Sequence, residues 1–320
     1  MRRHCRRRVA APGRKRRHHI GRRRARAQLS RAHPRHRLAE GGRPTGLRAT
    51  GSNEWVVDGD HSATRSPLLA NDPHLSLTLP ATFHEVHLVA RSLDVIGGSL
   101  PGVPFVALGH NRRIAWGATN NRLDVTDTFQ EQVVPDPASP SGLSSVHGNS
   151  HEPIIPLPQA FFFNPIGDGT PDNITSAAGP QFPQIPPVVL IMPRRNNGPI
   201  IELDAAAGTA LSVQYVGFGG TRELDAFYGF DHARDLAEFE DALRLFDVGS
   251  QNFVCADIGG DIAYFVAGAM PLREDLDAGT VTGLPPFFIR NGTGGNEWLP
   301  AAPSPEQAVP YELLPFEELP

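Results

Sequence analysis

The amino-acid sequence predicts an α+β fold built on antiparallel sheets. Short apolar runs recur from residue 52 onward, turn-forming Gly, Pro, Asn and Asp residues separate them, and one segment alone has clear helical periodicity. A doubly wound parallel sheet would need a helix after almost every strand, so this pattern favours an α+β or sandwich architecture. With 320 residues, the chain is long enough for one large domain or two ordinary ones.

The first expected strands lie before residue 121. Residues 54–60 ("EWVVDGD") and 83–102 ("FHEVHLVARSLDVIGGSLPG") are rich in Val, Leu and Ile and are bounded by turn residues, which predicts strands. Residues 104–120 ("PFVALGHNRRIAWGATN") predict two further strands joined by a tight turn at 109–111. This region is therefore interpreted as a series of hairpins.

The middle of the chain is rich in loops. Residues 134–200 contain the strong turn segments "PDPASPSG" and "GDGTPDN". Strands are expected within this stretch at 186–193 and 198–204.

One amphipathic helix is expected at residues 233–246, followed by a hairpin at 252–271 that turns at Gly259-Gly260. From residue 276 the chain is rich in Pro and Gly. The apolar positions of the expected helix fall on one face: Leu236, Phe239, Leu243 and Phe246.

Charge divides the chain into two parts of opposite character. Residues 1–50 contain 17 Arg and one Lys against a single acid, Glu40. Residues 51–320 contain 12 basic and 33 acidic side chains, so the overall charge of −4 hides a body with a net charge of −21. An acidic body gives no support to nucleic-acid binding, and no nucleic-acid partner is expected.

The basic segment 1–50 has two interpretations. It has neither helical nor strand periodicity, so we expect it to be disordered. One interpretation is an arm that binds nucleic acid or another anionic surface. The other is a GC-rich gene translated in the wrong frame, because Lys15 is the only lysine in the whole chain. We favour the second, and no apolar run follows the charges to make a secretory signal peptide.

Cysteine content and hydropathy exclude several classes of protein. The two cysteines, Cys5 and Cys255, allow neither a disulfide framework nor a cysteine-rich metal site. Cys255 alternates with apolar neighbours and is expected to be a small buried side chain. No apolar run approaches the length of a membrane span, so no membrane partner is expected.

Several polar residues of the body are hard to explain by packing, although each has a structural interpretation. His74, after an Asp-Pro pair, can cap a turn, and His110-Asn111 can form the tight turn of a hairpin. The "DVTD" segment at 124–127 can be a solvated loop, and Ser52 after Gly51 has no meaning alone.

Taken together and in this order, these residues resemble the penicillin acylase family of N-terminal nucleophile hydrolases. The resemblance runs from Gly51 to Pro320, and it implies that 51–320 is the N-terminal part of the family's β chain, within a four-layer αββα sandwich of antiparallel sheets. The motifs that carry it are "GSNEW", "LLANDPHL", "PGVPFVALGHNRRIAWGATN", "DVTDTF", "NNGPII", "SQNFVCAD", "GGDIAYFVAGAMPLR" and "LPPFFIRNGTGGNEW".

The resemblance gives the Gly51–Ser52 bond a chemical role. In this family the precursor is cut autocatalytically before the serine, which becomes the N-terminus of the large chain. A serine hydroxyl is a poor nucleophile unless a base removes its proton. The free α-amino group of Ser52, with an ordinary pKa of about 8, would be that base, whereas an amide nitrogen has no basic lone pair. An uncut chain is therefore expected to be inactive.

The resemblance implies the remaining roles residue by residue. Ser52 is the expected nucleophile, and His74 is expected to position it and to assist the precursor cut. The backbone N–H of Asn120 is expected to donate to the oxyanion, which is typically worth about 3–4 kcal/mol in the transition state. Leu75 and Leu108 are expected to line the acyl pocket, where two leucines favour an aliphatic or bulky acyl group.

A structural calcium site is also implied, while no catalytic cofactor is. Its expected ligands are Asp124, Asp127 and the backbone carbonyls of Thr126 and Pro271, and hard oxygen donors of this kind suit calcium. Two further carboxylates of the family site, one from the small α chain and one from later in the β chain, are missing here. The site is therefore expected to be incomplete.

The implied function is an amide hydrolase, or acylase, that releases an acyl group from a penicillin-, cephalosporin- or acyl-homoserine-lactone-like amide through an acyl-Ser52 intermediate. The expected partners are this small-molecule amide and the missing α chain. The family is periplasmic or secreted. The second half of the β chain, with an asparagine oxyanion donor, is also missing, so the 320-residue chain alone is expected to be inactive. The alternative is an inactive truncated product whose basic arm binds anions non-specifically.

Overall fold

A computed structural model describes residues 51–76, 78–165, 167–170, 173–176, 187–276, 283–302, 309 and 311–320. The expected disorder of residues 1–50 lies outside the described residues. Within Gly51–Pro320, which is one structural unit, the described residues are mostly antiparallel strands with two α-helices. The predicted α+β class is confirmed.

A six-stranded antiparallel sheet combines the hairpins of residues 84–120 with the later hairpin of residues 251–267. Its strands follow the order β17-β16-β6-β5-β4-β3. Strands β6 and β16, far apart in sequence, are neighbours at its centre. The strands are β3 (His84–Ala90), β4 (Leu93–Ser99), β5 (Leu108–Asn111), β6 (Ile114–Asn120), β16 (Gln251–Asp257) and β17 (Ile262–Ala267).

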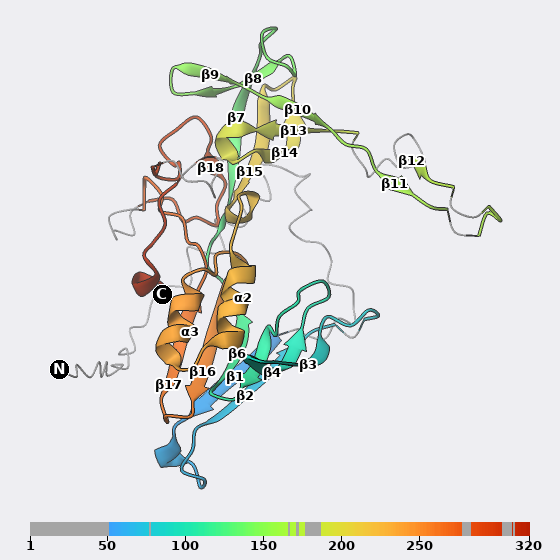
Figure 1. Cartoon of the computed structure of the whole chain (residues 1–320). Coiled ribbons are helices and arrows are strands. Elements are labelled where there is room, and N and C mark those ends of the chain that lie inside the picture. Colours follow the sequence, from blue (N-terminus) through green and yellow to red (C-terminus); the bar gives the residue numbers. More distant parts are fainter. Residues whose placement is uncertain are drawn as a thin grey trace, which may run out of the picture. The chain divides into compact units, whose positions relative to one another are not determined.

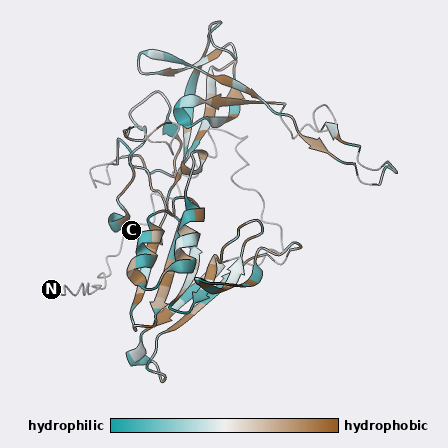
Figure 2. Cartoon of the chain, in the orientation of Figure 1, coloured by the Kyte–Doolittle hydropathy of each residue, from teal (hydrophilic) through white to brown (hydrophobic). Residues whose placement is uncertain are grey.

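Two helices, α2 (Glu223–His232) and α3 (Leu236–Leu243), lie side by side on one face of this sheet (Figure 1). Side chains from both helices and from the central strands form the largest core, in which Phe230 stacks on Phe239 at 4.5 Å between ring centroids. Trp116 of β6 and Phe253 of β16 project from the sheet into this aromatic cluster. In Figure 2 both helices carry hydrophilic residues, whereas the strands beneath them are largely hydrophobic.

A two-stranded ribbon, β1 (Gly51–Val57) and β2 (Leu68–His74), packs on the opposite face of the sheet. The Asn71 side chain joins the two layers: its Oδ1 accepts from the Ala118 N–H at 3.2 Å and its Nδ2 donates to the Ala118 carbonyl at 2.9 Å. Gly117 makes this close approach possible, because a Cβ there would lie 2.6 Å from that of Asn71. Helices, sheet and ribbon correspond to three successive layers of the expected sandwich.

A second, eight-stranded sheet is built around β7, and its main path is β10-β13-β14-β15-β7-β8-β9. Strand β18 pairs with β7 in parallel, and every other pairing is antiparallel. The strands are β7 (Thr126–Pro135), β8 (Leu143–His147), β9 (Ser150–Pro153), β10 (Ile155–Pro158), β13 (Val188–Met192), β14 (Gly198–Asp204), β15 (Thr209–Tyr215) and β18 (Arg290–Asn291).

Short elements complete the described structure. They are the strand pair β11 (Phe162–Phe163) and β12 (Thr175–Ser176), and the 3₁₀ helices η1 (Gly59–His61), η2 (Pro193–Arg195), η3 (Val216–Phe218) and η4 (Phe316–Glu318).

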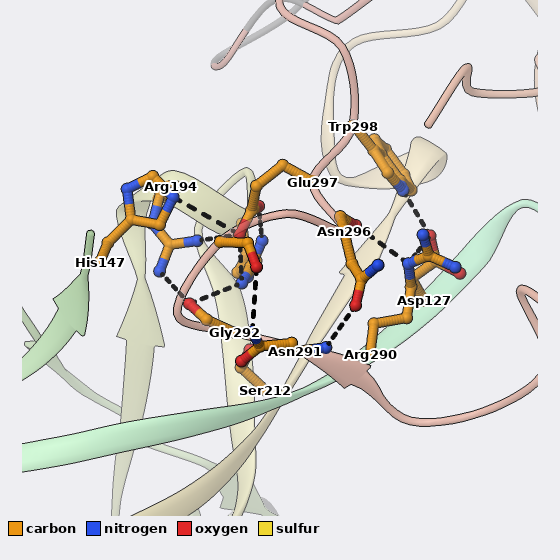
Figure 3. A network of polar contacts seen from close by, with 12 residues as sticks. Asp127, His147, Arg194, Ser212, Arg290, Asn291, Gly292, Asn296, Glu297 and Trp298 are labelled. Carbon is orange, nitrogen blue, oxygen red and sulfur yellow. Dashed lines mark hydrogen bonds and ion pairs between the residues drawn. The ribbon is translucent and has the colours of Figure 1, made fainter. Parts of the chain in front are cut away.

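A buried polar network holds the second sheet against the segment around residue 297 (Figure 3). Glu131 of β7 is fully buried and pairs with Arg195 through Oε1 and Nε at 3.0 Å. Arg194 and Arg195 both also pair with Glu297, so one loop carboxylate bridges two guanidinium groups. Because the charges are paired and hydrogen bonded, the network can be buried without leaving an isolated ion.

Most sequence-predicted strands are confirmed, including the hairpin that turns at Gly259-Gly260. The tight turn expected at 109–111 is wrong by two residues, because β5 continues to Asn111. The Asn111 Oδ1 accepts from the N–H groups of Arg113 at 2.7 Å and Ile114 at 2.9 Å, which closes the turn after the strand.

The helix expected at 233–246 is confirmed as α3, but α2 was not predicted. Gly229 and three aromatic residues weaken the helical pattern of α2. Gly229 is required by packing, since a Cβ there would lie 2.5 Å from the Cβ of Ala242 on α3.

Candidate active site

A cavity of about 330 Å³ opens where the β1–β2 ribbon, the end of β6 and helix α2 meet. Its walls are mostly apolar and include a few polar groups, as is usual for sites that bind small molecules. The apolar lining includes Leu75, Phe83, Leu100, Leu108, Phe227, Phe246, Val248 and Phe253, and the polar lining includes Ser52, Thr119, Asn120, Glu223 and Gln251.

Ser52 lies in β1, and its side chain faces the sheet. It is half-buried and stands directly opposite Pro73 of β2. Directly opposed residues of an antiparallel pair point to the same face, so Ser52 shares the inner face of the ribbon with Pro73, and Glu54 and Asn71 follow two residues along on each strand. The hydroxyl is therefore placed at the cavity, in line with the residues that hold the ribbon to the sheet.

Asn120 is the last residue of β6, and its backbone N–H points away from β16. The pair that follows it is hydrogen bonded, with the Asn121 N–H donating to the Ser250 carbonyl at 3.0 Å. Hydrogen-bonded and non-hydrogen-bonded pairs alternate in an antiparallel ladder, so the Asn120 N–H points toward the other side. The Ala118 N–H points to that same side and donates to Asn71 of the ribbon. The Asn120 N–H is thus directed to the side from which the ribbon approaches.

The two leucines expected in an acyl pocket both line the cavity. Leu75 follows directly after β2 and Leu108 begins β5. The fold therefore brings two residues that are 33 positions apart in the sequence to the same cavity. With Phe227 of α2, they give the cavity an apolar wall contributed by three different elements.

His74 is not among the residues that line the cavity. It stands opposite Gly51, one residue out of step with Ser52, so its side chain projects from the outer face of the ribbon. There its Nε2 lies 3.0 Å from the Asp72 carboxylate, and about half of the side chain is exposed. His74, expected to position the Ser52 hydroxyl, therefore lies on the opposite face of the ribbon from it in this chain, in which the 51–52 bond is intact.

Three polar residues at or behind the cavity wall, Glu54, Thr119 and Asn252, were not given a role from the sequence. The Thr119 hydroxyl donates to Glu54 Oε1 at 3.0 Å, and Asn252 Nδ2 donates to Thr119 Oγ1 at 3.1 Å. Burial raises the pKa of the Glu54 carboxyl to about 7. The period-2 alternation of β1 places Glu54 on the same face as Ser52, and that was the available signal.

Two of the oxygen donors expected to bind calcium, the Asp127 carboxylate and the Pro271 carbonyl, are instead occupied by a guanidinium group, which also lies 3.8 Å from the Asp124 carboxylate. Arg273 donates from Nε to Asp127 Oδ2 at 2.7 Å, from Nη1 to the Pro271 carbonyl at 3.1 Å, and from Nη2 to the Asp124 carbonyl at 2.8 Å. The Trp298 indole N–H also donates to Asp127 Oδ2, at 2.6 Å (Figure 3). A divalent cation would have to displace a charge that already satisfies these acceptors, so the arrangement does not fit calcium.

The other expected ligand, Thr126, begins β7 and pairs with Tyr215. Among the described residues, no group of three or more His, Cys, Asp and Glu side chains could hold a metal ion. In the same part of the chain, no helix is long and apolar enough to cross a membrane.

Comparisons with known proteins agree on one family. The sequence model described as penicillin amidase matches residues 8–320. The penicillin acylase 2 proenzyme of Pseudomonas sp. (strain SE83) is 29% identical over 279 residues, which cover 87% of this chain and 31% of that protein. An acyl-homoserine lactone acylase of Pseudomonas fluorescens (strain Pf0-1) is 25% identical over 227 residues, 70% of this chain and 25% of that protein.

A solved structure of a thermostable penicillin G acylase from Alcaligenes faecalis superposes with a TM-score of 0.60 at 22% identity. The match covers 82% of this chain and 40% of that one, and it supports the likeness of fold. The chain spans about a third or less of the length of these curated relatives.

Proposed function

The chain belongs to the penicillin amidase family, and we propose that it carries the nucleophile and the acyl pocket of an amide hydrolase. The observation that supports this most is the convergence of Ser52, Asn120, Leu75 and Leu108 on one apolar cavity. These residues come from different strands and loops, and each was expected at the site from its motif. Family membership implies no catalytic cofactor.

In the proposed reaction, the Gly51–Ser52 bond is first cut, which frees the Ser52 α-amino group. That amine takes the proton of the Ser52 hydroxyl as the oxygen attacks the amide carbonyl, since a hydroxyl needs such activation near neutral pH. The acyl group then occupies the cavity, and the leaving amine departs with the transferred proton. Water hydrolyses the acyl-Ser52 ester in a second step.

Charge on the carbonyl oxygen grows during the attack, and the Asn120 N–H is the proposed donor to it. A donor of this kind is worth more in the transition state than in the ground state, and its removal typically slows the reaction by about a hundred- to a thousandfold. We propose that His74, opposite Gly51, acts at the bond to be cut rather than at the acyl pocket. The α chain of the acylase is the proposed partner of the whole protein.

The cavity supports an aliphatic or bulky apolar acyl group as the substrate class. Aliphatic side chains at Leu75 and Leu108 line the cavity together with aromatic rings, and apolar residues outnumber polar ones in its wall. Apolar contact of this kind contributes about 25 cal/mol per Å² of buried surface, so a longer chain binds more tightly until the cavity is full.

Binding of product acids tests this proposal in the chain as it stands. Octanoate should bind more tightly than acetate by isothermal titration calorimetry, and Leu108→Trp, which fills the cavity, should weaken octanoate binding at least tenfold. Leu224→Trp, on the exposed side of α2, is the matched control and should leave binding unchanged. Equal binding of octanoate to the Leu108→Trp variant and the original chain would contradict the proposed acyl pocket.

A further inference from the structure

Glu54 occupies an unusual place for a carboxylate, because it lies two residues after Ser52 on the face of β1 that packs against the sheet. One of its oxygens, Oε1, accepts from the Thr119 hydroxyl at 3.0 Å. The other, Oε2, is buried and makes no well-formed hydrogen bond, although the backbone of Val254 is near enough to the carboxyl group to favour its charged form. A half-satisfied buried carboxyl group costs stability, so its presence beside the nucleophile calls for an account in terms of function.

Asn252 of β16 connects this carboxyl group to the backbone of Asn120. Its Nδ2 donates both to Thr119 Oγ1 at 3.1 Å and to the Asn120 carbonyl at 3.3 Å. Its Oδ1 accepts from Asn121 Nδ2 at 2.8 Å and from the Tyr264 hydroxyl at 2.6 Å. All four polar contacts of this amide therefore go to residues of β6, of β17 or of the turn after β6.

The ionised Glu54 carboxylate sets the direction of each hydrogen bond in this network. Thr119 has a single hydroxyl proton, and a carboxylate can only accept, so that proton points to Glu54. The Thr119 oxygen is then left to accept from Asn252, which sets the orientation of that amide. With the amide oriented, its NH₂ group holds the Asn120 carbonyl and its oxygen holds Asn121.

We propose that Glu54 is a positioning residue of the acyl-transfer site, which restrains the backbone on both sides of the Asn120 N–H through Thr119 and Asn252. The proposal rests on the proposed function, because the Asn120 N–H matters only as a donor to the reacting oxygen. Thr119 and Asn120 both line the cavity, whereas Glu54 does not, so Glu54 acts through them.

The surroundings of Glu54 make this orientation dependent on pH. Burial raises its pKa to about 7, and Tyr264 is the titratable group that faces it from β17. Asp72 and His74 of β2 project from the outer face of the ribbon. Once the Ser52 amine is free, its positive form stabilises the carboxylate and shifts the Glu54 pKa downward.

Two variants separate the hydrogen bond from the charge. Glu54→Gln keeps an acceptor for the Thr119 hydroxyl, and Glu54→Met keeps the length of the side chain but removes the acceptor. Glu85→Met, at an exposed glutamate of β3, is the matched control. In nuclear magnetic resonance spectra of the full chain, Glu54→Met should shift the side-chain amide signals of Asn252. It should also speed exchange of the Asn120 N–H about tenfold, while Glu54→Gln and Glu85→Met stay within about threefold of the original chain.

An activity measurement gives the second readout. In a chain that starts at Ser52, and so has the free amine, we expect Glu54→Met to slow acylation of Ser52 by an activated ester about tenfold at unchanged half-saturating ester concentration. Glu54→Gln should restore the rate, since a displaced donor forfeits part of a hundred- to thousandfold effect. If the unsubstituted chain that starts at Ser52 is not acylated either, the proposed function fails while the amide signals still decide the positioning role. Unchanged Asn252 and Asn120 signals in Glu54→Met, or faster exchange throughout the core, would overturn the proposal.

Discussion

The guanidinium of Arg273 lies against the buried carboxylate of Asp127, with Nε 2.7 Å from Oδ2. Both side chains are almost completely buried, and the pair joins the start of β7 to the segment that follows β17. Arg273 also binds the carbonyl oxygens of Pro271 and Asp124, so one side chain closes a loop that was expected to need a metal ion.

Removing this side chain should be strongly destabilising. We expect Arg273→Met to lower the free energy of unfolding by about 3–5 kcal/mol, because it removes the main ion-pair partner of the buried Asp127 carboxylate and leaves only Arg290, whose Nε is 3.8 Å from Oδ2. Urea unfolding followed by tryptophan fluorescence measures the change. Arg222→Met, which breaks an exposed pair with Asp225, should cost about 1 kcal/mol or less.

Addition of calcium tests whether these oxygens are held by the Arg273 guanidinium or form a metal site. Millimolar calcium should leave the melting temperature of the original chain unchanged, because Arg273 already satisfies the oxygens. A rise of several degrees with calcium, lost again in Asp127→Asn, would show that a metal ion binds there.

The Asn71 side chain should be important for holding the nucleophile strand on the sheet. Asn71→Ala removes three hydrogen bonds, two to the N–H and carbonyl of Ala118 and one to the Asn53 carbonyl, and the loss of such partners typically costs about 1–3 kcal/mol. Asn53→Ala, on the outer face of the same ribbon, is the control and should cost about 0.5 kcal/mol or less. Equal losses in the two variants, measured by chemical unfolding, would mean that Asn71 does not link the layers.

Glu54 should make the folded chain less stable as the pH rises. Its pKa in the folded chain, about 7, lies above the ordinary 4.5, so the folded state holds more protons between these values. Stability from this group is therefore full below pH 4.5 and is lost as the pH rises through 7. After allowance for partial exposure, the loss is about 1–2 kcal/mol.

Glu54→Gln should abolish this part of the pH dependence and stabilise the chain at pH 8 relative to the original. Asp231, whose pKa burial raises to about 6, contributes in the same direction and remains in both proteins. The difference between the two unfolding curves from pH 5 to 8 therefore isolates Glu54. A difference that does not change with pH would contradict the assignment.

Motif order predicted which residues meet at the cavity, but not which way their side chains face. Ser52, Leu75, Leu108 and Asn120, each named from the resemblance, line one cavity. His74 lies on the other face of the ribbon, because a shift of one residue in the register of β1 and β2 reverses the face, and the loop between the strands does not reveal that register.

Contacts between residues far apart in the sequence are the second feature that local patterns do not predict. The "DVTD" segment indicated a cluster of oxygen ligands, and the fold supplies a cation to it from Arg273, about 150 positions later. Helix α2 was missed because Gly229 lowers its helical propensity, while close packing against Ala242 requires that glycine. Both outcomes depend on tertiary contacts that local pattern and propensity do not contain.

Acylation of Ser52 tests the central claim most directly. A chain that starts at Ser52, made by removal of an initiator methionine, has the free amine that the proposed mechanism needs. It would be incubated with the p-nitrophenyl ester of octanoic acid, whose good leaving group lowers the demand for oxyanion donors, and then digested for mass spectrometry.

We predict a single octanoyl group on the peptide that begins with Ser52, formed more slowly in Leu108→Trp and absent in Ser52→Ala. Octanoylation that persists in Ser52→Ala, or a Ser52 peptide that stays unmodified while the ester is consumed, would contradict the assignment of Ser52 as the nucleophile.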